Sequence, residues 1–229
     1  MKIYAISDIH GCFIPFLYAL DIILEHLEEP DTKLVLLGDY IHGGDESRQV
    51  LDKIMNLQAK YGTDKVIALM GNHEDFVLEG FSSIDNVYVG YLSDQDHCDT
   101  KYIRWMENLP KYYVEGNTIF VHAGINEEAA DEWKWETSEY EFLQKYPHQL
   151  GKIAGLDKKV VAGHIHTSEI ADDSYFHDIY YDGDSHIYID GDVLTNGILP
   201  ILLVDTDKDE YYQVTENWQI PLEPYDYDE

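Results

Sequence analysis

The sequence predicts an α/β (α+β) fold, and three features of the chain carry this prediction. Apolar runs typical of strands alternate with amphipathic helical segments through the first third of the chain, a pattern that indicates parallel strands joined by right-handed crossovers. The early runs are apolar without interruption, as in strands buried on both faces of a sheet. With 229 residues, the chain can bury one substantial core but is short for two domains.

The first third reads as a βαβαβ series. Strands are expected at Lys2–Ser7, Leu34–Leu37 and Lys65–Met70. The first connecting helix shows apolar residues at three-and-four spacing, which are Phe13, Phe16, Leu17, Leu20, Ile23, Leu24 and Leu27. The second helix is expected over roughly Glu46–Lys60, with an apolar stripe of Val50, Ile54 and Leu57 and a stop at Gly62.

Residues 81–99 break this pattern with Gly, Ser, Asp and Tyr, and we interpret them as a variable excursion over the site. Short helices are expected over Thr100–Asn108 and near Ser138–Tyr146. The remaining expected strands, the first two of which form a hairpin, are Lys111–Val114, Thr118–Val121, Lys159–Ala162, Ile179–Tyr181, His186–Ile189, Ile201–Asp205 and Glu210–Val214. We expect residues 1–220 to form a single domain and residues 221–229 to form a loose acidic tail.

The composition is strongly acidic, with 45 Asp and Glu against 15 Lys and Arg and a formal net charge of −30. Such a surface repels nucleic-acid polymers and anionic membranes, so neither is an expected partner. Two cysteines in no metal-binding spacing fit a reducing cytosol. The sequence shows neither a signal-peptide pattern nor an apolar run long enough to span a bilayer. These features predict a cytoplasmic protein.

The segment Leu34–Gly44, which reads LVLLGDYIHGG, places Asp39 at the C-terminal end of a central strand. Open α/β sheets bind their ligands at these strand ends. A lone Asp at such a position is most often a turn or cap residue, and a lone His is most often a hydrogen-bonded loop or core residue. Four other strand-to-loop junctions, however, also end in metal-binding residues, which are Asp8 and His10, Asn72 and His73, His122, and His164 and His166. We therefore expect one shared pocket.

Carboxylate, imidazole and amide oxygen donors together suit manganese, iron or zinc rather than a thiolate-binding metal. The candidate donors are too many for one ion but suit two ions that share a bridging carboxylate. A metal pair polarises a phosphoryl oxygen and lowers the pKa of a bound water. It would also supply the positive charge that an anionic substrate needs on so acidic a protein.

The blocks Asp8-x-His10-Gly, Gly38-Asp39, Gly71-Asn72-His73-Glu74, His122-Ala-Gly and Gly163-His164-x-His166 resemble those of the calcineurin-like metallophosphoesterase superfamily. The nearer likeness is to the bacterial and phage branch of the serine/threonine protein phosphatases, which includes symmetrical diadenosine tetraphosphate hydrolases. The blocks span Asp8 to His166 in the family's order. The resemblance implies a four-layer sandwich of two mixed β-sheets flanked by helices, with the metals at the strand ends.

The resemblance also implies a role for each matching residue. The implied metal ligands are Asp8, His10 and His166 on the first ion, Asp39 on both ions, and Asn72, His122 and His164 on the second. His73 would be the general acid. Mn²⁺ is the first choice for both ions, with iron or zinc as alternatives.

The second block departs from the family pattern GD-x-x-DRG, because this chain has His42-Gly43 where relatives have Asp-Arg. The missing Asp normally orients the general-acid histidine, so the partner of His73 stays open. The missing Arg normally forms a bidentate contact with phosphate. We predict that His42 faces the site as a substrate-binding residue that contacts the phosphate or the leaving group.

Together these features predict a phosphoesterase with two metal ions that acts by direct attack of metal-bound hydroxide. The first choice is a serine/threonine phosphoprotein phosphatase. The alternatives are a symmetrical dinucleoside tetraphosphate hydrolase or a phosphodiesterase and, from another class, a catalytically impaired metal-binding interaction protein. The expected partner is a phosphorylated protein or a nucleotide, and the oligomeric state stays open.

Overall fold

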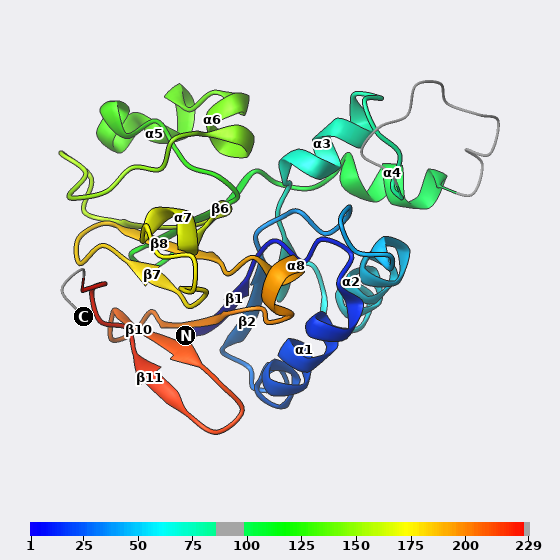
Figure 1. The fold of residues 1–229 in the computed structure, drawn as a ribbon, viewed down its shortest axis with the longest axis horizontal. Helices are drawn as coiled ribbons and strands as arrows, with labels where there is room; N and C mark the ends of the chain where they lie inside the picture. The colour runs from blue at the N-terminus through cyan, green and yellow to red at the C-terminus, as the bar shows by residue number, and fades with distance from the viewer. Residues whose placement is uncertain (86–98, 227–229) are drawn as a thin grey trace.

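The computed structural model describes residues 1–85 and 99–226, which form two β-sheets with helices on their outer faces (Figure 1). The first sheet has the strand order β11-β10-β9-β1-β2-β3, and the second has the order β4-β5-β6-β8-β7. Both sheets are mixed, because parallel strands in each are extended by antiparallel ones. The predicted fold class is thereby confirmed.

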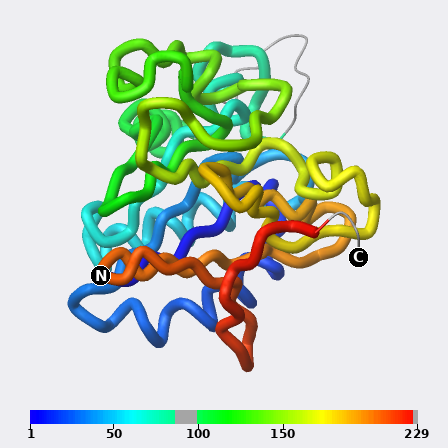
Figure 2. Tube along the Cα trace, turned by 90° about the vertical axis from the view of Figure 1, so that its left-hand side faces the viewer, coloured from blue at the N-terminus to red at the C-terminus, as the bar shows by residue number. Residues whose placement is uncertain are grey.

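The parallel half of the first sheet is the βαβαβ series expected from the sequence. Its elements are β1 (Lys2–Ile6), α1 (Phe13–Leu27), β2 (Thr32–Leu36), α2 (Ser47–Tyr61) and β3 (Val66–Ala68). The antiparallel half comes from the end of the chain and comprises β9 (Ile201–Asp205), β10 (Glu210–Val214) and β11 (Gln219–Pro221). Figure 2 shows these late strands, in orange and red, beside the blue first strand, with which β9 pairs.

The second sheet follows the excursion and begins with a hairpin. Its strands are β4 (Tyr112–Glu115), β5 (Thr118–Val121), β6 (Lys159–His166), β7 (Tyr180–Tyr181) and β8 (His186–Asp190). The short helical segments around both sheets are α3 (Asn72–Leu78), α4 (Thr100–Met106), η2 (Glu127–Glu132), α5 (Trp133–Glu136), α6 (Glu139–Gln144), α7 (Thr167–Ile170) and α8 (Val193–Asn196). None of the helices in these described regions is long and apolar enough to cross a membrane.

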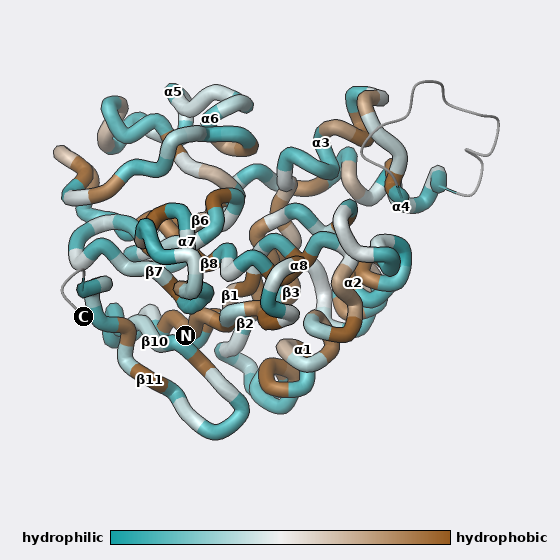
Figure 3. Tube along the Cα trace, in the orientation of Figure 1, coloured by the Kyte–Doolittle hydropathy of each residue, from teal (hydrophilic) through white to brown (hydrophobic). Residues whose placement is uncertain are grey.

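Strand alternation explains why the central strands are apolar on both faces. Along β1, Ile3 and Ala5 pack between the sheets, whereas Tyr4 and Ile6 pack against the layer that holds α1 and α2. In the second sheet, Phe120 faces the first sheet, and its neighbours on β5 pack with the residues of α5 and α6. Figure 3 shows the resulting hydrophobic segments on β1, β2 and β3. The four layers bring strand ends of both sheets to one side of the molecule.

One expectation from the sequence, the excursion, falls largely outside the described residues, and another, the loose tail, differs from the structure. The predicted excursion at residues 81–99 lies largely in 86–98, and Cys98 is also outside the described residues. The expected loose tail is attached at least as far as Tyr225, whose ring lies 4.9 Å from that of Phe176. An aromatic anchor within an acidic segment explains this difference. The domain boundary at residue 220 stays a prediction.

A buried ion cluster joins β8 to the η2 segment. His186 is 2% exposed, with Nδ1 2.8 Å from Asp182 Oδ2 and Nε2 3.2 Å from Glu127 Oε1. Burial alone would lower the pKa of His186, but these hydrogen bonds outweigh burial and raise it to about 9. The folded protein therefore stabilises the imidazolium form of His186, which donates a hydrogen bond from each ring nitrogen.

This cluster predicts a pH dependence of stability. Because the folded-state pKa lies above the unfolded value of about 6.5, the stabilisation by His186 is complete below that pH and is lost as pH rises through about 9. We expect His186→Asn to lower the free energy of unfolding by on the order of 3 kcal/mol near pH 6 and by much less near pH 9.5. Urea unfolding of the unmodified protein and the variant, both in buffer that contains a chelator, measures this difference. An equal loss of stability at the two pH values would contradict the prediction.

Candidate active site

The loops after β1 and β2 run side by side beyond the strands. The backbone N–H of Asp8 donates to Gly38 O at 3.2 Å, and that of His10 donates to Asp39 O at 2.9 Å. Gly38 has a φ of +106°, and a Cβ at this position would lie 2.6 Å from Gly71 Cα. Only glycine therefore lets the loop after β2 touch the loop after β3.

Several candidate residues have a left-handed backbone, which L-residues other than Gly rarely adopt. Each such residue costs on the order of 1–3 kcal/mol, and such strain gathers at functional sites. The candidates with positive φ are Asp8 (52°), His10 (48°), Asp39 (55°), His42 (71°) and His164 (67°). Five of the nine non-glycine residues with a positive φ in the described regions are thus residues that the sequence pattern selected.

Strand β6 brings the second sheet to the same place. It runs through His166 instead of ending at Ala162 as expected, and its pairing with β8 shifts register between these two residues. The irregularity contains Gly163, where a Cβ would lie 2.0 Å from both Asp8 Oδ2 and Ser7 Oγ. The backbone N–H of His164 donates to Asp8 Oδ2 at 3.1 Å. An irregular strand of this kind redirects a side chain, here beside the loop after β1.

Two groups of donor atoms share Asp39. One group is His10, Asp39 and His73, and the other is Asp39, His122 and His164, with the donor atoms of each group within 4.8 Å of one another. Asp39 Oδ2 lies 3.8 Å from His10 Nε2, whereas Oδ1 lies 3.5 Å from His122 Nε2. Asp39 therefore offers one oxygen to each group, which is the arrangement that a bridging carboxylate requires.

Backbone carbonyls orient two of the candidate histidine ligands. His10 Nδ1 lies 3.2 Å from Ile41 O, and His122 Nδ1 lies 3.0 Å from Leu37 O. Because a carbonyl only accepts, each Nδ1 carries the hydrogen and leaves the Nε2 lone pair for the site. Metal-binding histidines are typically held in this way.

Unsatisfied acceptors also indicate a cation site. Asp8 Oδ1 is buried without a hydrogen-bond partner. His122 Nε2 lies 2.8 Å from Asn72 Oδ1, so two acceptors face each other once His122 Nδ1 is protonated. Buried polar atoms without partners destabilise a fold, and divalent ions coordinated by these atoms would satisfy them. The donor set therefore fits a metal pair.

The ionisation states agree with this fit. Burial would raise the pKa of Asp39, but the neighbouring His122, His73 and His10 outweigh burial and hold it well below its usual range. Burial, with His122 next, lowers the pKa of His164 to about 4. At neutral pH the site thus presents an anionic carboxylate and a neutral imidazole, the forms that bind metals.

His42 lies against His73 rather than in an open cavity. The two Nδ1 atoms are 2.8 Å apart, and His42 Nε2 lies 2.7 Å from Ser83 O. Since Ser83 O can only accept, His42 donates from Nε2 and accepts at Nδ1 from the Nδ1–H of His73. The Nε2 of His73 then faces Asp39, with Oδ2 at 3.7 Å.

This geometry supplies the orienting partner of His73 that the sequence left open. His42 is 1% exposed, and both of its ring nitrogens are engaged within the protein. The arrangement favours a positioning role over the expected contact with substrate, and that contact stays a prediction. Arg48, another conceivable phosphate contact, is paired with Asp85 at 2.7 Å and with Asp99.

Glu74 is a site residue to which the sequence analysis gave no role. It is fully buried and accepts from the backbone N–H groups of Asp39 at 2.9 Å, Tyr40 at 2.9 Å and Gly71 at 3.1 Å. Burial, then repulsion from Asp39, raises its pKa to about 8 against these three donors. Glu74 therefore holds the loops after β2 and β3 together. Its position directly after Asn72-His73 in the sequence could have indicated that it belongs to the site.

His166 is not brought into either donor group. Its side chain is 47% exposed, with Nε2 3.8 Å from Asp190 Oδ2 and Nδ1 3.9 Å from Asp192 Oδ2. Asp190 is buried, and burial followed by repulsion from Asp8 raises its pKa. Asp190 lies at the end of an apolar strand, as Asp39 does, and Gly191 follows it. This position at a strand end could have identified Asp190 as a site residue from the sequence. A metal-binding role for His166 stays a prediction.

Comparison with known proteins places these features in a family. The family model of the calcineurin-like phosphoesterases matches residues 1–207. The symmetrical bis(5'-nucleosyl)-tetraphosphatase of Nitrosospira multiformis is 30% identical over 130 residues, which are 55% of this chain and 44% of that relative. The corresponding enzyme of Chromobacterium violaceum is 34% identical over 130 residues, with the same shares. The asymmetrical bis(5'-nucleosyl)-tetraphosphatase PrpE of Anoxybacillus flavithermus is 30% identical over 142 residues, 52% of this chain and 56% of that relative.

Solved structures share the fold at lower identity. The cold-active protein-tyrosine phosphatase of a Shewanella species matches with a TM-score of 0.67 and 16% identity, covering 97% of this chain and 80% of that one. A serine/threonine phosphatase of Saccharomyces cerevisiae matches with a TM-score of 0.57 and 14% identity, covering 97% and 79%.

These structural likenesses establish the fold alone, and the chain spans about half the length of the curated relatives it matches. The family model, in contrast, covers most of the chain and includes all of the candidate site. The chain belongs to the calcineurin-like phosphoesterase family.

Proposed function

We propose that this enzyme hydrolyses dinucleoside tetraphosphates, most simply by symmetrical cleavage. The observation that carries the proposal is the 30–34% identity to symmetrical bis(5'-nucleosyl)-tetraphosphatases over 130 residues. The first choice from the sequence, a serine/threonine phosphoprotein phosphatase, is supported by a likeness of fold alone. The alternative is therefore the better-supported substrate class.

The leaving group supports the same choice. Cleavage of an anhydride bond releases a nucleotide phosphate, which is a far weaker base than the alkoxide released from phosphoserine. Cleavage of the anhydride therefore depends less on proton transfer to the leaving group and on an arginine that binds the phosphate. Gly43 stands where the phosphate-binding arginine is found in the protein phosphatases, and the site compensates for this loss more easily with a good leaving group.

We assign the metal-binding roles to Asp39 and to the donor residues around it, with Asp8 in place of His73 beside His10. Asp8, His10 and Asp39 would hold one divalent ion, and Asp39, Asn72, His122 and His164 would hold the other. When bound, such a pair supplies Lewis acidity to the phosphoryl group and a nucleophile at neutral pH. Mn²⁺ is the proposed metal, and the binding of His166 to the first ion and the cytoplasmic location are further proposals.

The proton-transfer role belongs in this proposal to His73. Its Nδ1 hydrogen is donated to His42, so its Nε2 faces Asp39 and carries a proton only in the imidazolium form, which burial disfavours by lowering the pKa of His73 to about 4. That proton would pass to the bridging oxygen that leaves with the nucleotide. His42 acts as a positioning residue because it fixes the ring and the tautomer of His73.

The proposal predicts a substrate preference. We expect the Mn²⁺-loaded protein to cleave diadenosine tetraphosphate with a higher kcat/KM than it shows for a phosphoserine peptide or p-nitrophenyl phosphate. Chromatography of the products separates the two modes, because symmetrical cleavage gives two ADP and asymmetrical cleavage gives ATP and AMP. Faster turnover of the phosphopeptide would restore the phosphoprotein phosphatase, and absence of turnover with every substrate and metal would support the impaired binding protein.

A further inference from the structure

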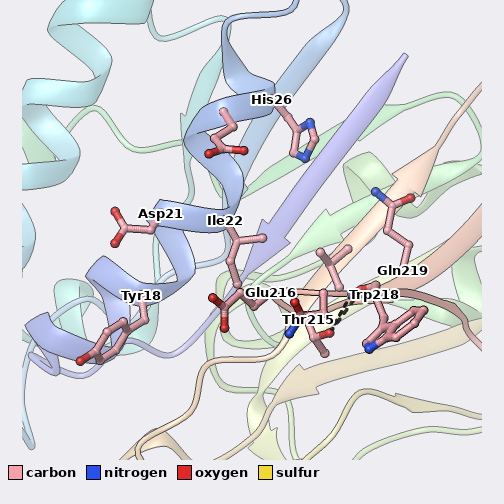
Figure 4. Close-up of a pocket in the computed structure, with 11 residues that line it drawn as sticks. Tyr18, Asp21, Ile22, His26, Thr215, Glu216, Trp218 and Gln219 are labelled. Atoms are coloured by element: carbon pink, nitrogen blue, oxygen red, sulfur yellow. Dashed lines mark hydrogen bonds between the residues drawn. The ribbon is translucent and has the colours of Figure 1, made fainter.

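A groove lies between the second half of α1 and the β10–β11 hairpin, away from the strand ends that carry the candidate site (Figures 1 and 4). Its volume is about 760 Å³. Figure 4 shows side chains of the helix on one wall and those of the hairpin turn on the other. Its lining residues are Tyr18, Asp21, Ile22, Glu25, His26 and, from the hairpin, Val214, Thr215, Glu216, Asn217, Trp218 and Gln219.

The hairpin displays its tryptophan from a turn that two hydrogen bonds close. The backbone N–H of Thr215 donates to Trp218 O at 2.9 Å, and that of Trp218 donates to Thr215 Oγ1 at 3.2 Å. Trp218 is nevertheless 72% exposed, and Tyr18 on the opposite wall is 68% exposed. Exposed aromatic side chains have few rotatable bonds, so they lose little conformational entropy on binding and are typical anchors of interfaces.

The charge of the groove has one sign. Asp21 and Glu25 lie on the helix wall and Glu216 lies on the hairpin wall. Among the described residues that line the groove, none is Lys or Arg. His26, which also lines the groove, is stacked on Tyr4 at 5.4 Å between ring centroids and lies 3.6 Å from Glu29.

We propose that this groove docks a basic peptide segment of a partner protein. Arg or Lys side chains would pair with the three carboxylates and lie on the face of Trp218, because guanidinium and ammonium groups bind both kinds of surface. Ile22 and Val214 offer apolar contact for the intervening side chains. A second copy of the chain is a poor occupant, because two proteins of net charge −30 repel each other, and nucleic acids are excluded for the same reason.

Fluorescence anisotropy of a labelled peptide of alternating Arg and Leu tests the proposal, with a Glu and Leu peptide as the negative probe, at about 0.15 M salt. The variants, made in the whole chain of 229 residues, are Trp218→Ala and Glu216→Gln. The matched controls are Trp135→Ala and Glu136→Gln, which alter an exposed Trp-Glu pair on α5, outside the groove. All four variants are expected to keep the phosphoesterase activity of the unmodified protein, which verifies folding independently of docking.

We expect the basic peptide to bind, Trp218→Ala to weaken binding by about tenfold or more, and Glu216→Gln to weaken it severalfold. The control pair should leave binding unchanged. Equal losses in both pairs would show only diffuse attraction to an acidic surface and would overturn the proposal, as would absence of binding. Self-association in sedimentation equilibrium that Trp218→Ala abolishes would instead assign the groove to a second copy.

Discussion

Asp39→Asn is expected to lower kcat/KM by at least about 10²–10³-fold on every substrate that the enzyme turns over. Asp39 is the one residue common to both donor groups, and it directs Oδ2 toward His10 and Oδ1 toward His122. The Asn variant keeps one oxygen but replaces the other with an amide nitrogen, which does not coordinate a metal. One ion therefore loses its shared ligand.

The fold should survive this change. The hydrogen bond from the backbone N–H of His73 to Asp39 Oδ1, 3.0 Å long, can be kept by the Asn oxygen. Elemental analysis after equilibration with Mn²⁺ should find two ions per chain in the unmodified protein and fewer in Asp39→Asn. Asp31→Asn, at an exposed position, alters the net charge equally and serves as control. A variant that keeps both ions and full activity would remove Asp39 from the metal centre.

The parallel half of the first sheet could be predicted because each of its elements is marked by its own periodicity. The βαβαβ series emerges from uninterrupted apolar runs and three-and-four spacing, and the alternation along β1 explains why both faces are apolar. Strand β11 could not be predicted, because all three of its residues are exposed and one of them is Pro221. The order of the second sheet depends on tertiary packing, which no local pattern of the sequence records.

The residues of the candidate site also divide into those that could be predicted from the sequence and those that could not. Residues that follow apolar strands could be identified from local sequence, as Asp39 and His122 illustrate, and Asp190 carries the same signal. The bond from His42 to Ser83 O could not be predicted, because it joins backbone and side chain across 41 positions. Strand β6 was predicted too short, since Gly163-His164 reads as a turn although it is an irregularity within a strand.

The pairing of His42 with His73 predicts a second large effect. His42→Ala removes the acceptor for the Nδ1–H of His73, so the ring loses its fixed tautomer and orientation. We expect kcat to fall by about 10²-fold, the lower range for general acid–base groups, with little change in KM. The loss should be greater for substrates with poor leaving groups than for p-nitrophenyl phosphate, whose leaving group needs little protonation.

His42→Asp is the informative companion of this variant. A carboxylate can accept from His73 Nδ1, so we expect it to recover much of the kcat that alanine loses, although Ser83 O then lacks its donor. Recovery by Asp would separate a positioning role from a general loss of packing, which thermal unfolding of both variants monitors. A rise in KM at unchanged kcat would instead support the substrate contact predicted from the sequence. Unchanged kinetics on every substrate would leave His42 without a part in the reaction, and His73 would then have to function without this partner.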